Sequence, residues 1–368
     1  MSAEEDKFLK PLILDIGADK FRLGWAGKDF PEIIAPSVYV DMTDFLFESD
    51  IIEGFEEIFI KGEEKHYYGH QALKYQNILK THEFKKEKNY VILGKYFQYY
   101  YNQLQIPEDY HYMQPLIILS SFLMSDLEKA KLQQIFFDQF NFPYLMFLSD
   151  GKAILSTLGK TSGVVVNIGE LNTYISTIFH GFTNIMARDT FPVSGKDLTD
   201  YFHNLILTGK GSRKNFYLDK WLTKEIKEKT SLCLLHPKKE KKRVKEGLSK
   251  YNRVISLPDN TKLQVNHERF MVSEPLFDPR IIHIDYISLS ESIANTIKFW
   301  ERENWEELLP NIILAGGSSS IPGLKDRLEK ELKKYFSDKL KPKIKVIAPS
   351  GRNFYRIFKK RLFSLENY

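Results

Sequence analysis

The stretch PLILDIG (11–17) is an apolar run that stops abruptly at a glycine, and it decides how the rest of the chain is interpreted. Two later stretches share this design, SGVVVNIG (162–169) and NIILAGG (311–317). Each pattern predicts a buried strand of four or five residues that ends in a tight turn. The sequence therefore predicts three central strands whose carboxyl ends carry glycine turns.

The first two of these stretches also resemble each other in the residues that come after the strand. In both, the strand ends in a carboxylate or its amide, then an apolar residue and a glycine: Asp15-Ile16-Gly17 and Asn167-Ile168-Gly169. An alternating run comes next, FRLGWAG (21–27) or TYISTIFHG (173–181), as is typical of the return strand of a hairpin. Two such units about 150 residues apart predict a duplicated α/β domain, in which each half offers a glycine turn to one cleft.

Helices are predicted in the segments behind these turns. Ser125 and Glu128 have the spacing of a capping box and mark the start of one helix. The basic run KKEKKRVKE (238–246) favours a solvated helix or loop over a polyanion site, because two glutamates interrupt it. Residues 39–66 lack a clean period and predict an elaborated loop or small subdomain, with apolar residues that could make contacts. The predicted helices cover LEKAKLQQIFFDQF (127–140), DLTDYFHNLIL (197–207), WLTKEIKEKTSLCLL (221–235) and LKDRLEKELKKYF (324–336).

Composition narrows the class of protein. The chain has 368 residues, 43% of them hydrophobic, which is enough to bury the cores of two lobes. A net charge of +5 is too small to argue for nucleic acid, and no run of eighteen apolar residues predicts a membrane span. Cys233 is the single cysteine, and the N-terminus lacks the apolar core of a signal peptide. We therefore expect a soluble, cytoplasmic protein with neither a membrane nor a specific nucleic acid as partner.

The glycine turns suit the binding of phosphate. Backbone N–H groups in tight turns bind phosphates well, and glycine lets the main chain approach them closely. Asp15, at the end of the first strand, could hold Mg²⁺ through water molecules, because this ion keeps much of its hydration shell. Arg22 could reach the phosphates from the return strand, with Gly17 in its own turn and Gly169 in the opposing one.

In combination, these segments resemble actin and the actin-related proteins. DIGADKFRLGWAGKDFP (15–31) and NIGELNTYISTIFHGF (167–182) are similar to the two phosphate hairpins of that family, and the match runs from residue 11 to about 356. Further segments match in order and spacing: SGKDLTDYF (194–202), IKEK (226–229), HERF with EPLFDP (267–279) and LAGGSSSIPGLKDRLEKEL (314–332).

The resemblance implies an α/β fold of two lobes, built from duplicated RNase H-like domains with two smaller inserted subdomains around a nucleotide cleft. Four parts are expected along this chain. The first-lobe core takes residues 1–36, 84–157 and 353–368, with 37–83 inserted; the second-lobe core takes 158–193 and 285–352, with 194–284 inserted.

The resemblance also implies ATP or ADP and Mg²⁺ as ligands. It places Asp15 at the water shell of the metal, Gly17 and Arg22 at the phosphates, and Gly169 with Glu170 in the second phosphate turn. The base and ribose side would be lined by Lys224, Lys227, Glu228, Gly316, Gly317 and Ser318.

The departures from the family pattern fall at the positions that would bind phosphate or activate water. Asp150 stands where the family has a water-polarising glutamine, so it could orient water or repel the γ-phosphate. Other changed positions of the two turns hold Ala18, Asp19, Asn167, Leu171 and Tyr174. The sequence also stops some thirty residues before the family's terminal helices do.

These departures favour a structural or regulatory subunit of the cytoskeleton or of a multiprotein complex over a fast enzyme. We expect it to hold a nucleotide with weak or absent hydrolysis and to associate with other actin or actin-related subunits. A polymerising actin-like ATPase that uses Asp150 is the alternative.

Overall fold

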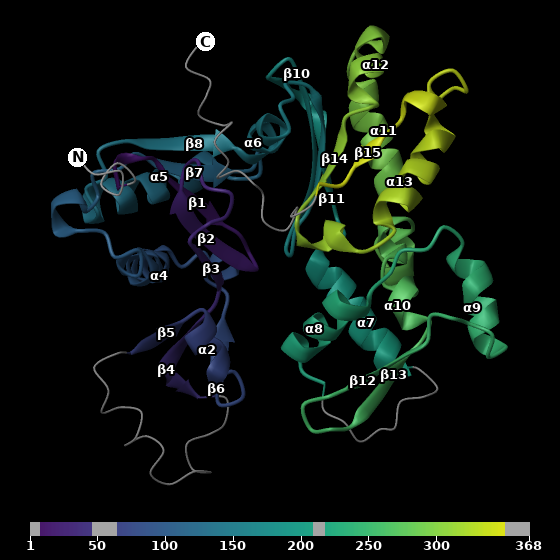
Figure 1. Ribbon diagram of the computed structural model, residues 1–368, viewed down its shortest axis with the longest axis horizontal. Helices are drawn as coiled ribbons and strands as arrows, with labels where there is room; N and C mark the ends of the chain where they lie inside the picture. The colour runs from purple at the N-terminus through teal and green to yellow at the C-terminus, as the bar shows by residue number, and fades with distance from the viewer. Residues whose placement is uncertain (1–7, 46–64, 209–217, 350–368) are drawn as a thin grey trace. The chain divides into compact units, whose positions relative to one another are not determined.

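The computed structural model describes residues 8–45, 65–208 and 218–349, which fall into two compact units (Figure 1). Unit 1 holds the described residues up to Gly159, and unit 2 holds those from Lys160 onward. Among the residues described, no helix combines the length and the apolar character that crossing a bilayer requires.

Unit 1 is built on a five-stranded mixed sheet with the strand order β3-β2-β1-β7-β8. β1 pairs with β2 in antiparallel fashion and with β7 in parallel. β8 in turn pairs with β7 in parallel. The strands are β1 (Leu12–Ile16), β2 (Lys20–Trp25), β3 (Ile33–Pro36), β7 (Leu116–Ser120) and β8 (Leu145–Ser149).

Unit 2 repeats this sheet with the order β11-β10-β9-β14-β15. β9 is antiparallel to β10 and parallel to β14, and β15 is parallel to β14, so each strand direction matches its counterpart in unit 1. The strands are β9 (Gly163–Ile168), β10 (Thr173–Phe179), β11 (Phe182–Phe191), β14 (Ile312–Ala315) and β15 (Val346–Ile347). The predicted duplication and the α/β class are confirmed.

Two small sheets stand apart from the large ones. Unit 1 has the three-stranded sheet β5-β4-β6, and unit 2 has the β12–β13 hairpin. Residues 46–64 and 350–368 lie outside the described part, so the predictions for them, including the third piece of the first lobe, stay predictions, as does the four-part division. The strands are β4 (Tyr39–Phe45), β5 (His66–Tyr68), β6 (Leu79–His82), β12 (Arg253–Ser256) and β13 (Lys262–Val265).

Helices complete each unit, and the capping box at Ser125 is present with both of its hydrogen bonds. In unit 1 they are α2 (His70–Lys74), α3 (Phe84–Glu87), α4 (Tyr90–Asn102), α5 (Asp126–Gln134), which runs on as a π-helix (Ile135–Gln139), and α6 (Asp150–Thr157). In unit 2 they are α7 (Gly195–Thr208), α8 (Lys220–Thr230), α9 (Pro237–Lys245), α10 (Glu268–Met271), α11 (Leu289–Lys298), α12 (Trp305–Leu308) and α13 (Leu324–Leu332). Short 3₁₀ helices span Glu108–Tyr110, Glu274–Leu276, Pro279–Ile282, Arg302–Asn304, Gly317–Ser320, Lys333–Tyr335 and Lys341–Lys343.

The two cores differ in character. In unit 1, Tyr96 of α4 packs against Phe21 of β2, and Phe97 of the same helix packs against Phe136, in a cluster rich in aromatic rings. In unit 2 the cluster is largely aliphatic, and α11 places Ile293 and Ile297 among it, along strands β10 and β11 (Figure 1). Each large side chain that becomes fully buried contributes about 1.5–3 kcal/mol, so each unit has a substantial core of its own.

The predicted helix over 221–235 is wrong in its last turn, because α8 ends at Thr230. Beyond it the backbone bonds to distant segments: the N–H of Leu232 donates to the Arg269 carbonyl, and that of Cys233 donates to the Pro322 carbonyl, both at 2.7 Å. These bonds replace the bonds to the residue four positions earlier that a helix would need.

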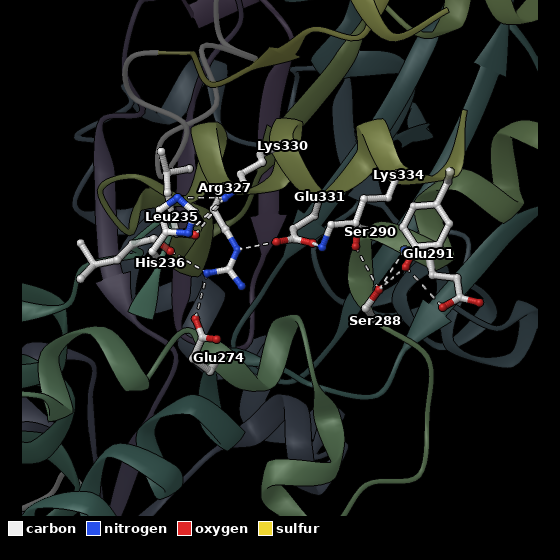
Figure 2. A network of polar contacts seen from close by, with 12 residues as sticks. Leu235, His236, Glu274, Ser288, Ser290, Glu291, Arg327, Lys330, Glu331 and Lys334 are labelled. Atoms are coloured by element: carbon white, nitrogen blue, oxygen red, sulfur yellow. Dashed lines mark hydrogen bonds and ion pairs between the residues drawn. The ribbon is translucent and has the colours of Figure 1, made fainter. Parts of the chain in front are cut away.

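The same segment holds α13 in place. Arg327 of α13 is buried and donates to the Leu234 carbonyl at 2.6 Å. Figure 2 shows its guanidinium between Glu274 and Glu331, with nitrogen–oxygen distances of 3.4 and 2.9 Å. Because α13 follows the glycine turn after β14, this network positions that turn as well.

Candidate functional site

The first glycine turn is tightly braced. The Gly17 N–H donates to the Lys20 carbonyl at 3.1 Å and closes the hairpin between β1 and β2. Buried Ser37 supports the turn from outside, since its hydroxyl donates to the Gly17 carbonyl at 2.8 Å and its N–H to the Asp19 carbonyl at 2.9 Å. A Cβ on Gly17 would lie 2.5 Å from the Lys20 carbonyl oxygen. Glycine is therefore required here by the close approach of the backbone.

Asp15 and Arg22 are direct cross-strand neighbours at the base of this turn. The Arg22 guanidinium lies 2.6 Å from the Asp15 carboxylate, and both side chains are mostly buried. Since a charge-assisted bond of this length neutralises much of each charge, Asp15 is an acceptor already shared with a cation of the protein. The sequence predicts both residues for the site but not their pairing.

Asp150 belongs to the same neighbourhood. It follows β8 as the first residue of α6, and its carboxylate accepts from the Gly151 N–H at 2.7 Å. Burial, together with the nearby charge of Asp15, raises the pKa of Asp150 to about 7. The structure thus brings Asp15, Gly17, Arg22 and Asp150 together in unit 1.

Lys85 is a further member of this group of residues in unit 1, and the sequence does not reveal it. It extends from α3, and its ammonium donates to the Ile16 carbonyl at the end of β1. Burial lowers the pKa of Lys85, while the charges of Asp15 and Asp150 act in the opposite direction. The contact joins positions 69 residues apart, and within the run EFKKEK (83–88) nothing sets Lys85 apart from its neighbours.

The second glycine turn, in unit 2, repeats the geometry of the first. The Gly169 N–H donates to the Asn172 carbonyl at 2.9 Å, and a Cβ on Gly169 would lie 2.8 Å from that oxygen. The carbonyl of Gly169 accepts from the Gly195 N–H at 2.8 Å, so the start of α7 is fixed against the turn. At the end of β9, the Asn167 amide donates to the Tyr174 hydroxyl at 2.7 Å.

Around this second turn, α8 contributes two buried lysines. Lys224 lies 3.3 Å from the carboxylate of Glu170. The ammonium of Lys227 donates to the Gly195 carbonyl at 3.0 Å and to the Thr199 hydroxyl at 2.7 Å, so it supports α7 from inside the protein. Glu228, also predicted for the site, is exposed on α8.

The third glycine segment lies against the second. A Cβ on Gly195 would meet the Ser318 hydroxyl at 2.6 Å and the Glu170 carboxylate at 2.9 Å, so these groups converge. Gly316 has φ +82°, and a Cβ there would lie 2.4 Å from both the Asn167 amide oxygen and the Ile168 carbonyl. Gly317 is exposed, with open space beside it.

These residues fit a nucleotide better than they fit a metal held directly. In each unit a turn whose glycine admits no side chain has cations near it, Arg22 and Lys85 in unit 1 and Lys224 in unit 2, and each arrangement taken by itself suits a phosphate group. Within the described ranges no group of three or more His, Cys, Asp or Glu side chains could hold a metal ion. A Mg²⁺ ion would therefore be held mainly through waters and phosphate oxygens, with Asp15 as the carboxylate at its water shell.

The chain is similar to known proteins over nearly its whole length. The model of the actin family matches residues 7–356. An actin-like protein of Neurospora crassa is 28% identical over 357 residues, which cover 94% of this chain and 88% of that protein. A Dictyostelium discoideum protein named "Putative actin-29" is 24% identical over 337 residues, 90% of this chain and 84% of that protein. With this match over nearly its whole length, the two-lobed fold expected from the resemblance is confirmed, and the chain belongs to the actin family.

Proposed function

We propose that this chain is a divergent actin-related protein that binds ATP or ADP together with Mg²⁺ and hydrolyses it weakly or not at all. It would act in the cytoplasm as a structural or regulatory subunit, in association with other actin-type subunits or within a multiprotein complex. In this proposal one nucleotide is contacted by both glycine turns.

The observation that carries the proposal is the matched geometry of the two turns. Gly17 and Gly169 close them with the same backbone bond, and each position excludes a Cβ by contact with a carbonyl oxygen. A side chain at either position would push the main chain away from a phosphate. Both turns have therefore kept the feature that phosphate binding needs, although the residues around them have changed.

The chain's own residues have distinct roles in holding the ligand. Arg22 and the N–H groups of the two turns would contact phosphate oxygens. The base and ribose would lie in unit 2, beside Lys224 and Glu228. When bound, Mg²⁺ would neutralise part of the phosphate charge. Asp15 would share its carboxylate between Arg22, 2.6 Å away, and the waters around the ion.

Weak hydrolysis is expected because Asn167 and Tyr174 at the second turn are hydrogen-bonded to each other and neither is suited to activating water. The amide of Asn167 carries no charge for a metal shell and donates to Tyr174. Tyr174 is a phenol whose oxygen accepts that bond, which makes it a poor group for taking a proton from water at neutral pH. Binding needs no aligned water, whereas hydrolysis does, so these changes lower turnover more than affinity.

One observation favours the second candidate function, a polymerising actin-like ATPase. The pKa of Asp150 is raised to about 7, which suits a general base near neutral pH. In that case Asp150 would accept a proton from the attacking water, and hydrolysis would accompany filament assembly. Phosphate release that is faster than the buffer blank, and that is lost in Asp150→Asn, would establish this function in place of the first.

Analysis of the nucleotide carried by the purified protein is the decisive experiment. The protein is denatured, and the released nucleotide is separated by chromatography, with a parallel titration of the emptied protein by ATP and ADP. Intact ATP, with no pelleting under Mg-ATP, supports the proposed function. ADP together with phosphate release supports the ATPase. No released nucleotide, together with no binding in the titration, overturns both.

A further inference from the structure

Lys85 occupies an unusual place for a lysine whose neighbours in the sequence are surface charges. The residue as a whole is exposed, yet its ammonium reaches inward from α3 and donates to the Ile16 carbonyl. Ile16 is the last residue of β1, between Asp15 and the glycine of the first turn. The cationic tip is thereby fixed at the carboxyl end of the central strand, beside the turn that would receive the phosphates.

The charged groups near the Lys85 ammonium indicate that it can take the place of a metal ion. The carboxylates of Asp15 and Asp150 both act on Lys85, and Lys85 acts in turn on Asp150. An ammonium is a compact cation with three N–H donors, and the bond to Ile16 uses one of them. A cation that feels the charges of these carboxylates and is bonded to the strand end beside the phosphate turn has surroundings that would also suit a hydrated Mg²⁺ ion.

We infer that Lys85 is a built-in cation at the first phosphate turn, which contacts nucleotide phosphate and reduces the need for a divalent metal. This inference rests on the proposed nucleotide binding and adds a residue to that site. Arg22 differs from Lys85 in that its guanidinium is already paired directly with Asp15 at 2.6 Å, which neutralises much of the charge that it could offer to a phosphate. The chemical class recognised is a nucleoside polyphosphate in its metal-free form as well as its metal-bound form.

The inference predicts a specific pattern of affinities. The wild-type protein should bind ATP in EDTA within about tenfold of its affinity in Mg²⁺. Lys85→Gln should weaken ATP binding in EDTA by about tenfold or more, the value of one charge-assisted hydrogen bond to an ionised group. In Mg²⁺ the same variant should lose less, because the ion then supplies the charge that the lysine no longer supplies.

Lys86→Gln is the matched control. Lys86 is the next residue of the same short helix, is exposed, and undergoes the same change of charge. It should bind ATP as the wild type does in both buffers. Binding is measured by isothermal titration calorimetry on the full chain, freed of nucleotide beforehand, and a thermal melt without ligand shows whether each variant is folded.

The possible outcomes separate the two proposals. If the wild type binds no nucleotide in either buffer, the proposed function fails and Lys85 has no such role. If the wild type binds and Lys85→Gln matches it in EDTA, Lys85 only braces the Ile16 carbonyl, and this inference alone is overturned. An equal loss in both buffers would also overturn the assignment of Lys85 to the place of the metal. A selective loss in EDTA supports it.

Discussion

At the residue scale, Gly316 shows how one backbone angle can fix a residue type. Its φ of +82° lies in the left-handed region, where a Cβ is strained, and the amide oxygen of Asn167 and the carbonyl of Ile168 fill the space in which a Cβ would stand. Gly317, one position on, has open space around it. Two adjacent glycines in the same turn are therefore under very different constraints.

Gly316→Ala should lower the free energy of unfolding of unit 2 by about 2–4 kcal/mol, the sum of backbone strain and displacement of the Asn167 and Ile168 oxygens. Gly317→Ala should change it by less than about 1 kcal/mol. Urea unfolding followed by fluorescence, with equal m-values required for all variants, measures both. Equal midpoints for the two variants would contradict the steric argument.

Asp150 carries a pH dependence whose sign can be worked out. Its pKa is about 7 in the folded chain against 3.8 ordinarily, so the folded state keeps the proton longer than the unfolded state does. The stability that this group contributes is fully present below about pH 4 and is lost as the pH rises to about 7. About one pH unit above 7 the carboxylate is ionised in both the folded and the unfolded state, and the loss is complete.

Asp150→Asn should remove this loss, so the variant should gain about 1–3 kcal/mol on the wild type between pH 4.5 and 7.5, after allowance for partial contact with solvent. Asp126→Asn is the control, because Asp126 is likewise the first residue of a helix but has a side chain that is 99% exposed. Chemical denaturation at several pH values gives the profiles. Parallel profiles for wild type and Asp150→Asn would mean that this carboxyl ionises normally.

At the scale of elements, the sequence predicts features set by local residues and misses those set by distant contacts. The glycine turns and the capping box at Ser125 depend on residues within four positions of one another, and their prediction is confirmed. The end of α8 depends on Arg269 and Pro322, which lie far along the chain, so the sequence predicts this helix one turn too long. Lys85 escapes prediction for the same reason, since its partner Ile16 is 69 positions away.

The contacts of Arg327 that hold α13 in place can be removed by a single substitution. Arg327→Met should lower the free energy of unfolding by about 3–5 kcal/mol, because it leaves the buried Glu274 carboxylate and the Leu234 carbonyl without their cation. Burial already raises the pKa of Glu274, with Arg327 opposing that effect, so loss of the guanidinium should raise this pKa further.

Lys333→Met gives the comparison near the end of the same helix. Lys333 forms a solvated ion pair with Glu329, at 3.4 Å, and its removal should cost less than about 1 kcal/mol. Thermal unfolding at pH 7 ranks the two variants. If Arg327→Met were as stable as Lys333→Met, the network drawn in Figure 2 would contribute no net stability to unit 2.

At the scale of the whole molecule, two units of the same topology have separate cores, one rich in aromatic rings and one largely aliphatic. The duplication is predictable because a strand ending in Asp-Ile-Gly or Asn-Ile-Gly recurs and each is followed by a return strand. The difference between the cores is not, since it depends on which helix residues meet which strands. A ligand held by both turns would make two otherwise separate stabilities depend on one binding event.

If one nucleotide contacts both turns, as the proposed function has it, ATP should slow amide hydrogen exchange in both units, not in one. At a concentration of ATP about a hundredfold above its Kd, exchange that requires release of the ligand should slow by about a hundredfold, both in peptides containing Gly17 and in those containing Gly169. Peptides from the capped start of α5 near Ser125 serve as an internal control, because local fraying there needs no release of ligand. Exchange measured by mass spectrometry with and without ATP tests the point. Protection confined to one unit would show that the nucleotide is held by a single turn, and the shared use of Gly17 and Gly169 would have to be abandoned.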